Sequence, residues 1–106
     1  MQDITPRELD ARMRRGELSP LLLDVREPWE IQICRLPNAE SIPMRLIPSS
    51  LDTLQRDRPI VVICHHGVRS RQVAQYLAHQ GFRQVLNLQG GVDAWARDVD
   101  TSMPTY

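Results

Sequence analysis

The chain has 106 residues, of which 42% are apolar and 25% charged, as in folded globular proteins rather than disordered chains. Thirteen basic residues balance thirteen acidic ones, so the net charge indicates neither nucleic acid nor an anionic membrane surface as a partner. All thirteen basic residues are arginine, and the absence of lysine excludes Schiff-base chemistry and a P-loop lysine.

The length and the first residues indicate the number of domains and the location of the protein. We expect one domain over residues 1–106. No apolar run approaches the roughly 20 residues that span a bilayer, and the start MQDITPRELD lacks the pattern of a secretory signal. We therefore expect no membrane partner and a cytoplasmic location. Two cysteines, Cys34 and Cys64, are too few for a disulfide framework, so the question is whether either is a nucleophile.

The first half of the chain contains helix and strand signals separated by prolines. Thr5-Pro6-Arg7-Glu8 has the pattern of a capping box and predicts a short helix that stops at Gly16. The apolar run at residues 21–25 predicts a strand covered on both faces. Three prolines make residues 26–44 mostly loop, with a helical turn near Trp29 and a short strand near Ser41.

The second half repeats the alternation more clearly. We expect a helix at 49–56, a strand at 60–63 and a helix at 70–80 that Gly81 ends in a left-handed conformation. A strand at 84–88, a turn at Gly90-Gly91 and a helix at 92–97 follow, and residues 98–106 are predicted to form an extended C-terminal arm. Strands separated by helices imply βαβ units, hence a parallel sheet with helices on both faces.

This layout indicates where chemistry can take place. Ligands of open parallel sheets bind beyond the carboxyl ends of the strands, and Cys64 lies at that end of the strand predicted at 60–63. Residues 65–69 must turn before the next helix, so several backbone N–H groups can point at one spot, with Gly67 permitting the unusual backbone angles. A cysteine there would be held as a reactive thiolate.

The same residues also allow other interpretations of the site. Cys64 could be a small buried apolar residue, and His65 and His66 could bind a metal. Adjacent residues rarely aim at one point, however, and no C-x-x-C or H-x-x-x-H partner exists, so we predict no metal site. Arg69 and Arg71 oppose the dipole at the start of a helix, which favours a bound anion there. His79, late in its helix, is expected at the surface.

Four segments, spread over nearly the whole chain, together resemble one known family. They are Leu22-Leu23-Asp24-Val25-Arg26-Glu27-Pro28-Trp29-Glu30, Leu36-Pro37-Asn38-Ala39 with Ile42-Pro43, Cys64-His65-His66-Gly67-Val68-Arg69-Ser70, and Gly90-Gly91-Val92-Asp93-Ala94-Trp95. In this order they resemble the motifs of the rhodanese family of sulfurtransferases. Two positions depart from the family's pattern, and they bear on which sulfur donor is preferred more than on the reaction class. His65-His66 stands where many relatives have Arg or Lys after the cysteine, and Cys34-Arg35 replaces a Gly-His pair.

The resemblance implies a fold and an activity. The fold is a rhodanese-like three-layer α/β domain with about five parallel strands. Cys64 is the expected catalytic residue, carrying sulfur as a persulfide from a donor such as thiosulfate to cyanide or a thiol, for example a small protein dithiol. The expected binding loop is His65, His66, Gly67, Val68, Arg69 and Ser70. No metal or organic cofactor is implied.

Three further residues are expected to support the loop. Asp24 and Arg26 follow a neighbouring strand, where they would orient the loop or pair with Arg69, or else form a purely structural ion pair. Arg71 is expected beside them, close to the start of the helix.

Two other function classes stay open on the sequence. Dual-specificity phosphatases and arsenate reductases use a related loop with five residues between Cys and Arg, whereas four separate Cys64 from Arg69. A non-catalytic binding or regulatory module is the second alternative. Such modules usually lack the cysteine, which this chain has.

Overall fold

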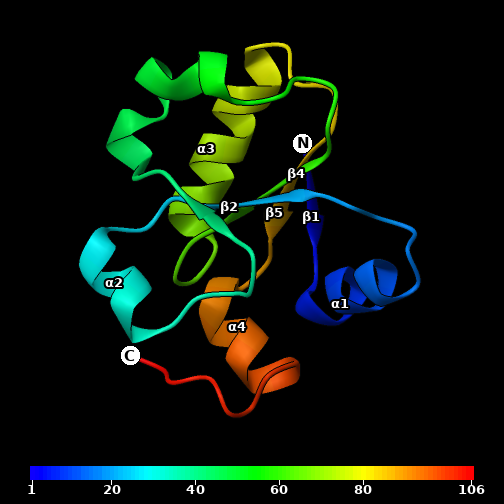
Figure 1. Cartoon of the computed structure of the whole chain (residues 1–106), viewed down its shortest axis with the longest axis vertical. Helices are drawn as coiled ribbons and strands as arrows, with labels where there is room; N and C mark the ends of the chain where they lie inside the picture. The colour runs from blue at the N-terminus through cyan, green and yellow to red at the C-terminus, as the bar shows by residue number, and fades with distance from the viewer.

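The computed structural model describes all 106 residues and contains one sheet of five parallel strands (Figure 1). The spatial order is β1-β5-β4-β2-β3, so β4 is the central strand and lies between β5 and β2. The strands are β1 (Gln2–Ile4), β2 (Leu21–Asp24), β3 (Glu40–Ser41), β4 (Ile60–Ile63) and β5 (Val85–Leu88). The predicted α/β fold with a five-stranded parallel sheet is confirmed.

Helices cover both faces of the sheet (Figure 1). One face is packed against α1 (Pro6–Arg14) and α4 (Gly91–Asp98), which also contact each other. The other face carries α3 (Val68–His79), with the 3₁₀ segments η1 (Met44–Leu46) and η2 (Pro48–Thr53) at its side. The short helix α2 (Pro28–Ile33) lies at the carboxyl end of β2. None of these helices is both long and apolar enough to cross a membrane.

The central strand β4 decides which face receives the cysteine. Its four residues are fully buried, with Val61 and Ile63 in the core beneath α1 and α4, and Ile60 and Val62 in the core beneath α3. Successive side chains of a strand point to opposite faces, so the residue after Ile63 continues on the α3 side. Cys64 indeed belongs to the core cluster beneath α3.

Most predicted elements are confirmed within a few residues, and two of the differences have local causes. The helix predicted at 49–56 is the 3₁₀ segment η2. The hydroxyls of Ser49 and Ser50 both donate to the Leu46 carbonyl, and such local side-chain bonds compete with a regular α-helix. Helix α3 begins at Val68, two residues earlier than predicted, because Gly67 takes a left-handed conformation with φ of 98° and turns the chain directly into the helix. The loop itself is therefore limited to residues 65–67.

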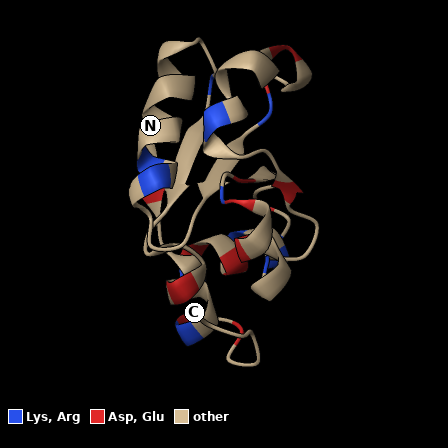
Figure 2. Ribbon diagram, turned by 90° about the vertical axis from the view of Figure 1, so that its left-hand side faces the viewer, with Lys and Arg blue, Asp and Glu red and all other residues tan.

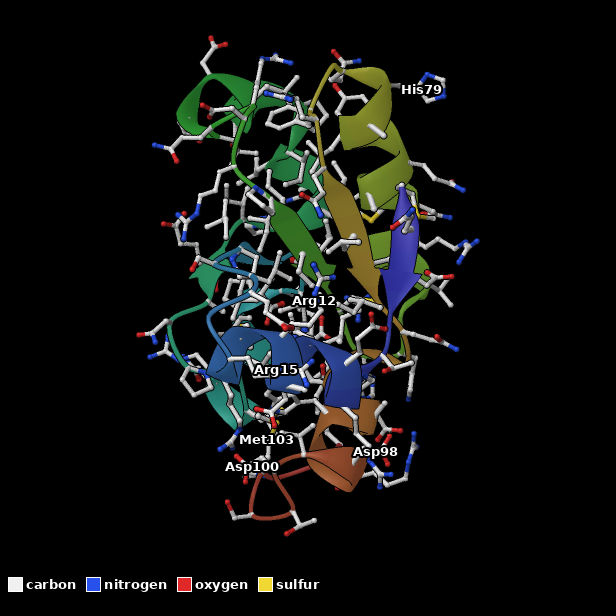
Figure 3. All side chains as sticks on the ribbon, turned by 90° about the vertical axis from the view of Figure 1, so that its right-hand side faces the viewer. Arg12, Arg15, His79, Asp98, Asp100 and Met103 are labelled. Atoms are coloured by element: carbon white, nitrogen blue, oxygen red, sulfur yellow. The ribbon has the colours of Figure 1, made fainter.

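Two segments at the ends of the chain differ from expectation in a more informative way. Strand β1 was not predicted, because only Ile4 of its three residues is buried and no alternation marks it. Residues 99–106 fold back over the domain rather than extending from it: Met103 is buried in the core beside α1 and α4, and Figure 3 shows it next to Asp100 at that end of the molecule. His79 points into solvent, as predicted (Figure 3).

Candidate functional site

The sulfur of Cys64 lies where β4 ends and α3 begins, almost completely buried with 1% of the residue exposed. The backbone N–H of Gly67 donates to Sγ at 3.1 Å, and the thiol donates to the hydroxyl of Ser70 at 3.2 Å. The first N–H groups of α3 have no partner within the helix, and the helix dipole places partial positive charge there. A backbone donor and the positive end of a helix dipole therefore face the Cys64 sulfur.

A buried chain of hydrogen bonds fixes the hydroxyl that contacts this sulfur. Ser70 donates to Oδ1 of Asn87 at 2.5 Å, and the Asn87 amide donates to Asp3 at 3.0 Å and to the Gly67 carbonyl at 3.3 Å. These contacts, together with Arg71, hold the pKa of Asp3 below its ordinary value. Sequence reasoning missed Asn87, although one buried polar residue in the strand VLNL was a signal for it.

The two glycines after β5 let α4 approach the loop. The N–H groups of Val92 and Asp93, in the first turn of α4, donate to the carbonyls of Cys64 at 2.9 Å and His65 at 3.1 Å. Gly91 has φ of 61°, and a Cβ there would collide with both carbonyls. The Gly90-Gly91 pair thus allows the N-terminus of α4 to approach and hold the loop that precedes α3.

Arg69 pairs with a residue that the sequence did not single out. Its two terminal nitrogens donate to the two carboxylate oxygens of Glu30 at 2.7 and 2.8 Å. The side chain of Glu30 is 4% exposed and that of Arg69 37%. The hydrogen bonds from Arg69 lower the pKa of Glu30 to about 2, and the Tyr106 hydroxyl adds to this effect while burial opposes it. The expected pairing of Arg69 with Asp24 or Arg26 is not what the structure shows.

Asp24 and Arg26 instead form a buried ion pair with each other, at 2.7 Å. The guanidinium also donates to the carbonyl of Cys34 at 2.7 Å and to the hydroxyl of Tyr106 at 2.9 Å. Burial opposes the charge of Arg26, but the bonds with Asp24 and Tyr106 outweigh it and raise the pKa of Arg26. The pair ties β2 to the residues after α2 and does not contact Arg69 directly.

Tyr106 links these groups from the last segment of the chain. Its hydroxyl donates to Oε2 of Glu30 at 2.7 Å, and its ring stacks on His65 with centroids 3.8 Å apart and planes 6° from parallel. Trp29 also contacts the Tyr106 ring in a T-shaped arrangement, with 5.9 Å between centroids. Burial raises the pKa of Tyr106 to about 12. Nothing in the sequence near Tyr106 indicated this position.

The two loop histidines come closer to a metal-binding arrangement than expected. His65, His66 and Asp93 each bring a ligand atom within 4.8 Å of the others. The two rings are tilted by 30°, with centroids 3.8 Å apart, and Nε2 of His65 is already hydrogen-bonded to the Tyr106 carbonyl. Burial and the neighbouring His66 lower the pKa of His65, so at neutral pH that ring is uncharged. The hydrogen bond with Tyr106 already occupies one of the two ring nitrogens of His65, so this set fits a metal poorly.

The structure therefore brings most of the predicted site together. Cys64, Gly67 and Ser70 are in direct contact, and Arg69 and His65 reach the same region through Glu30 and Tyr106. Arg71 is turned outward to Asp3, at 2.7 Å. Val68 is 68% exposed at the start of α3, so only its backbone belongs to the loop. His66 is mostly exposed and lies 4.0 Å from Asp93.

Comparisons with known proteins identify the family of the chain. Residues 5–98 match the family described as the rhodanese-like domain. A sulfurtransferase of Allochromatium vinosum is 41% identical over 97 residues, covering 92% of this chain and 90% of that protein. The thiosulfate sulfurtransferase GlpE of Vibrio cholerae is 36% identical over 76 residues, 72% of each chain. A solved rhodanese-like domain protein of Staphylococcus aureus superposes with a TM-score of 0.82 at 34% identity, covering 90% of this chain and 91% of that one. The chain belongs to the rhodanese-like domain family.

Proposed function

We propose that this protein is a sulfurtransferase that carries one sulfane sulfur on Cys64, taken from thiosulfate or a persulfide donor and passed to a thiol or cyanide. The observation that supports it most directly is the position of the Cys64 sulfur, at the N-terminus of α3 with the Gly67 N–H donating to it. The relatives named sulfurtransferases support the same reaction class.

In the first step the Cys64 thiolate attacks the outer sulfur of the donor. With thiosulfate, a bond forms between Sγ and the outer sulfur while the bond between the two donor sulfurs breaks. Sulfite leaves with the electron pair of that bond, and Cys64 becomes a persulfide. The Gly67 N–H and the first N–H groups of α3 stabilise the anionic terminal sulfur.

In the second step an acceptor thiolate attacks the terminal sulfur of the persulfide. The new bond joins acceptor and transferred sulfur, the Cys64 sulfur leaves as a thiolate, and the acceptor departs as a persulfide. With cyanide as acceptor, the product is thiocyanate. Both steps are displacements at sulfur, so the cycle needs neither an external oxidant nor a reductant.

Intact-mass measurement after incubation with thiosulfate tests the proposal. The protein should gain the mass of one sulfur atom, a dithiol should remove it, and Cys64→Ser should gain nothing. Cys34→Ser is the matched control and should still gain the sulfur. If neither thiosulfate nor a small alkyl persulfide transfers sulfur to the wild-type protein, the proposal fails and a non-catalytic binding module takes its place.

A further inference from the structure

All three arginines assigned to the site are already paired with carboxylates. Arg26 binds Asp24 at 2.7 Å, Arg71 binds Asp3 at 2.7 Å, and Arg69 binds Glu30 through two bonds. Figure 2 shows acidic and basic segments of the ribbon interspersed over the molecule. An incoming anion therefore meets ion pairs whose net charge is close to zero.

Arg69 is the arginine that a donor can reach. Its side chain is part exposed, whereas Glu30 behind it is almost fully buried. The carboxylate takes one donor from each terminal nitrogen, so the remaining N–H groups of the guanidinium can still contact an anion. What Glu30 removes is the unbalanced positive charge that an anion would feel at that point.

The two donor classes depend differently on that charge. Thiosulfate is a dianion whose sulfonate stays outside the loop when the outer sulfur contacts Cys64, so it needs a cation there. An alkyl persulfide carries at most a single negative charge, on the terminal sulfur that is transferred next to Cys64 Sγ, the atom to which the Gly67 N–H donates. The uncharged His65 does not replace the missing cation.

We infer that Glu30 determines donor specificity: by neutralising Arg69 it disfavours dianionic donors such as thiosulfate and leaves the site suited to alkyl or protein persulfides. This inference rests on the proposed function. Glu30 does not touch the reacting sulfur; it acts through Arg69, with Tyr106 and the Glu27 N–H holding its carboxylate in place.

The test compares kcat/KM for two donors, thiosulfate and 2-hydroxyethyl persulfide, at fixed ionic strength. The wild-type protein should prefer the persulfide at least about tenfold. Glu30→Gln keeps the side-chain shape and removes the charge, so kcat/KM for thiosulfate should rise about tenfold, mainly through KM, while the persulfide value changes less than about threefold. These magnitudes follow from one charge-assisted contact to the donor.

Two further variants separate specificity from structure. Glu27→Gln removes the same charge one helical turn away, where Glu27 pairs with Arg45, and should leave the donor ratio unchanged. In an Arg69→Ala background, Glu30→Gln should bring no gain for thiosulfate. A wild-type preference for thiosulfate, or an equal fall with both donors in Glu30→Gln, overturns the inference while leaving the proposed sulfur transfer intact. Failure with both donors in the wild-type protein contradicts the proposed function instead.

Discussion

The two cysteines of this chain occupy very different regions although both are buried. Cys64 is 1% exposed and lies at the N-terminus of α3, where Gly67 N–H donates to its sulfur. Cys34 is 8% exposed and caps the C-terminal end of α2. Its only polar contact through sulfur is with Arg26 at 3.8 Å. The sulfur of Cys64 thus faces a helix N-terminus with a backbone donor directed at it, whereas Cys34 follows the C-terminus of a short helix, where the dipole has the opposite sign.

The guanidinium beside Cys34 does not change this contrast. Arg26 is already bound to Asp24, to the Cys34 carbonyl and to Tyr106. The two thiols also belong to different core clusters, Cys34 beneath α1 and α4 and Cys64 beneath α3. Burial by itself therefore says little about a cysteine; what matters is which end of a helix and which backbone donors face the sulfur.

The largest expected effect comes from exchanging one thiol. Cys64→Ser should reduce sulfur transfer to the background rate, because a hydroxyl cannot accept sulfur from a donor. The serine fits the same space, so urea denaturation should show a loss of no more than about 2 kcal/mol in unfolding free energy. Turnover that persists in this variant would show that sulfur transfer does not depend on Cys64, and it would contradict the proposed difference between the two cysteine regions.

Displacing the loop while keeping the thiol should come next. Gly91→Ala places a Cβ against the carbonyls of Cys64 and His65, so we expect a loss of about 3 kcal/mol or more in unfolding free energy and at least about a tenfold loss of turnover. Gly16 has a similar φ, 71° against 61°, with open space around it.

Gly16→Ala is therefore the matched control. It should cost only the left-handed backbone penalty, about 1–2 kcal/mol, and leave turnover unchanged. Equal effects of the two substitutions would show that backbone strain, and not the contact between α4 and the loop, explains the loss in Gly91→Ala.

Glu30 connects the two regions, through Arg69 on one side and Tyr106 on the other. Its pKa is about 2 in the folded protein against 4.5 ordinarily, so the fold gains stability above about pH 4.5 and loses it as the pH falls toward 2. Since Arg69 is part exposed, water screens the pair, and we expect this part to be about 2 kcal/mol.

Urea denaturation at about pH 7 and about pH 2.5 measures this loss. The difference between the two pH values should be smaller in Glu30→Gln than in the wild-type protein. Glu27→Gln, which changes an exposed carboxylate, should behave like the wild type. An unchanged pH dependence in Glu30→Gln would mean that other carboxylates cause the acid sensitivity.

The smallest effect is expected at the second thiol. Cys34→Ala removes one sulfur atom from a core cluster and leaves the Arg26 bonds to Asp24 and the Cys34 carbonyl intact, so unfolding free energy should fall by about 1 kcal/mol. Turnover should stay within about twofold. A much larger drop in turnover, or a disulfide between Cys34 and Cys64 under mild oxidation, would show that Cys34 takes part in sulfur transfer. The two cysteines would then not differ in function as proposed.

The sequence by itself determined the elements whose signals are local. The buried runs of β2 and β4 were found from their apolar residues, α1 from its capping residues, and the end of α3 from Gly81. The position of Cys64 at the carboxyl end of β4 followed from the same pattern, because strand ends and glycine turns depend on only a few neighbouring residues.

Only the tertiary structure decided which side chains meet around that cysteine. Glu30 reaches Arg69 across 39 positions and Tyr106 reaches Glu30 across 76, while Asn87 approaches Ser70 because β5 lies beside β4. Strand β1 became a strand only by pairing with β5. Periodicity and turn chemistry carry no information on such distant partners, because the sheet order and the path of residues 99–106 over the surface place them together.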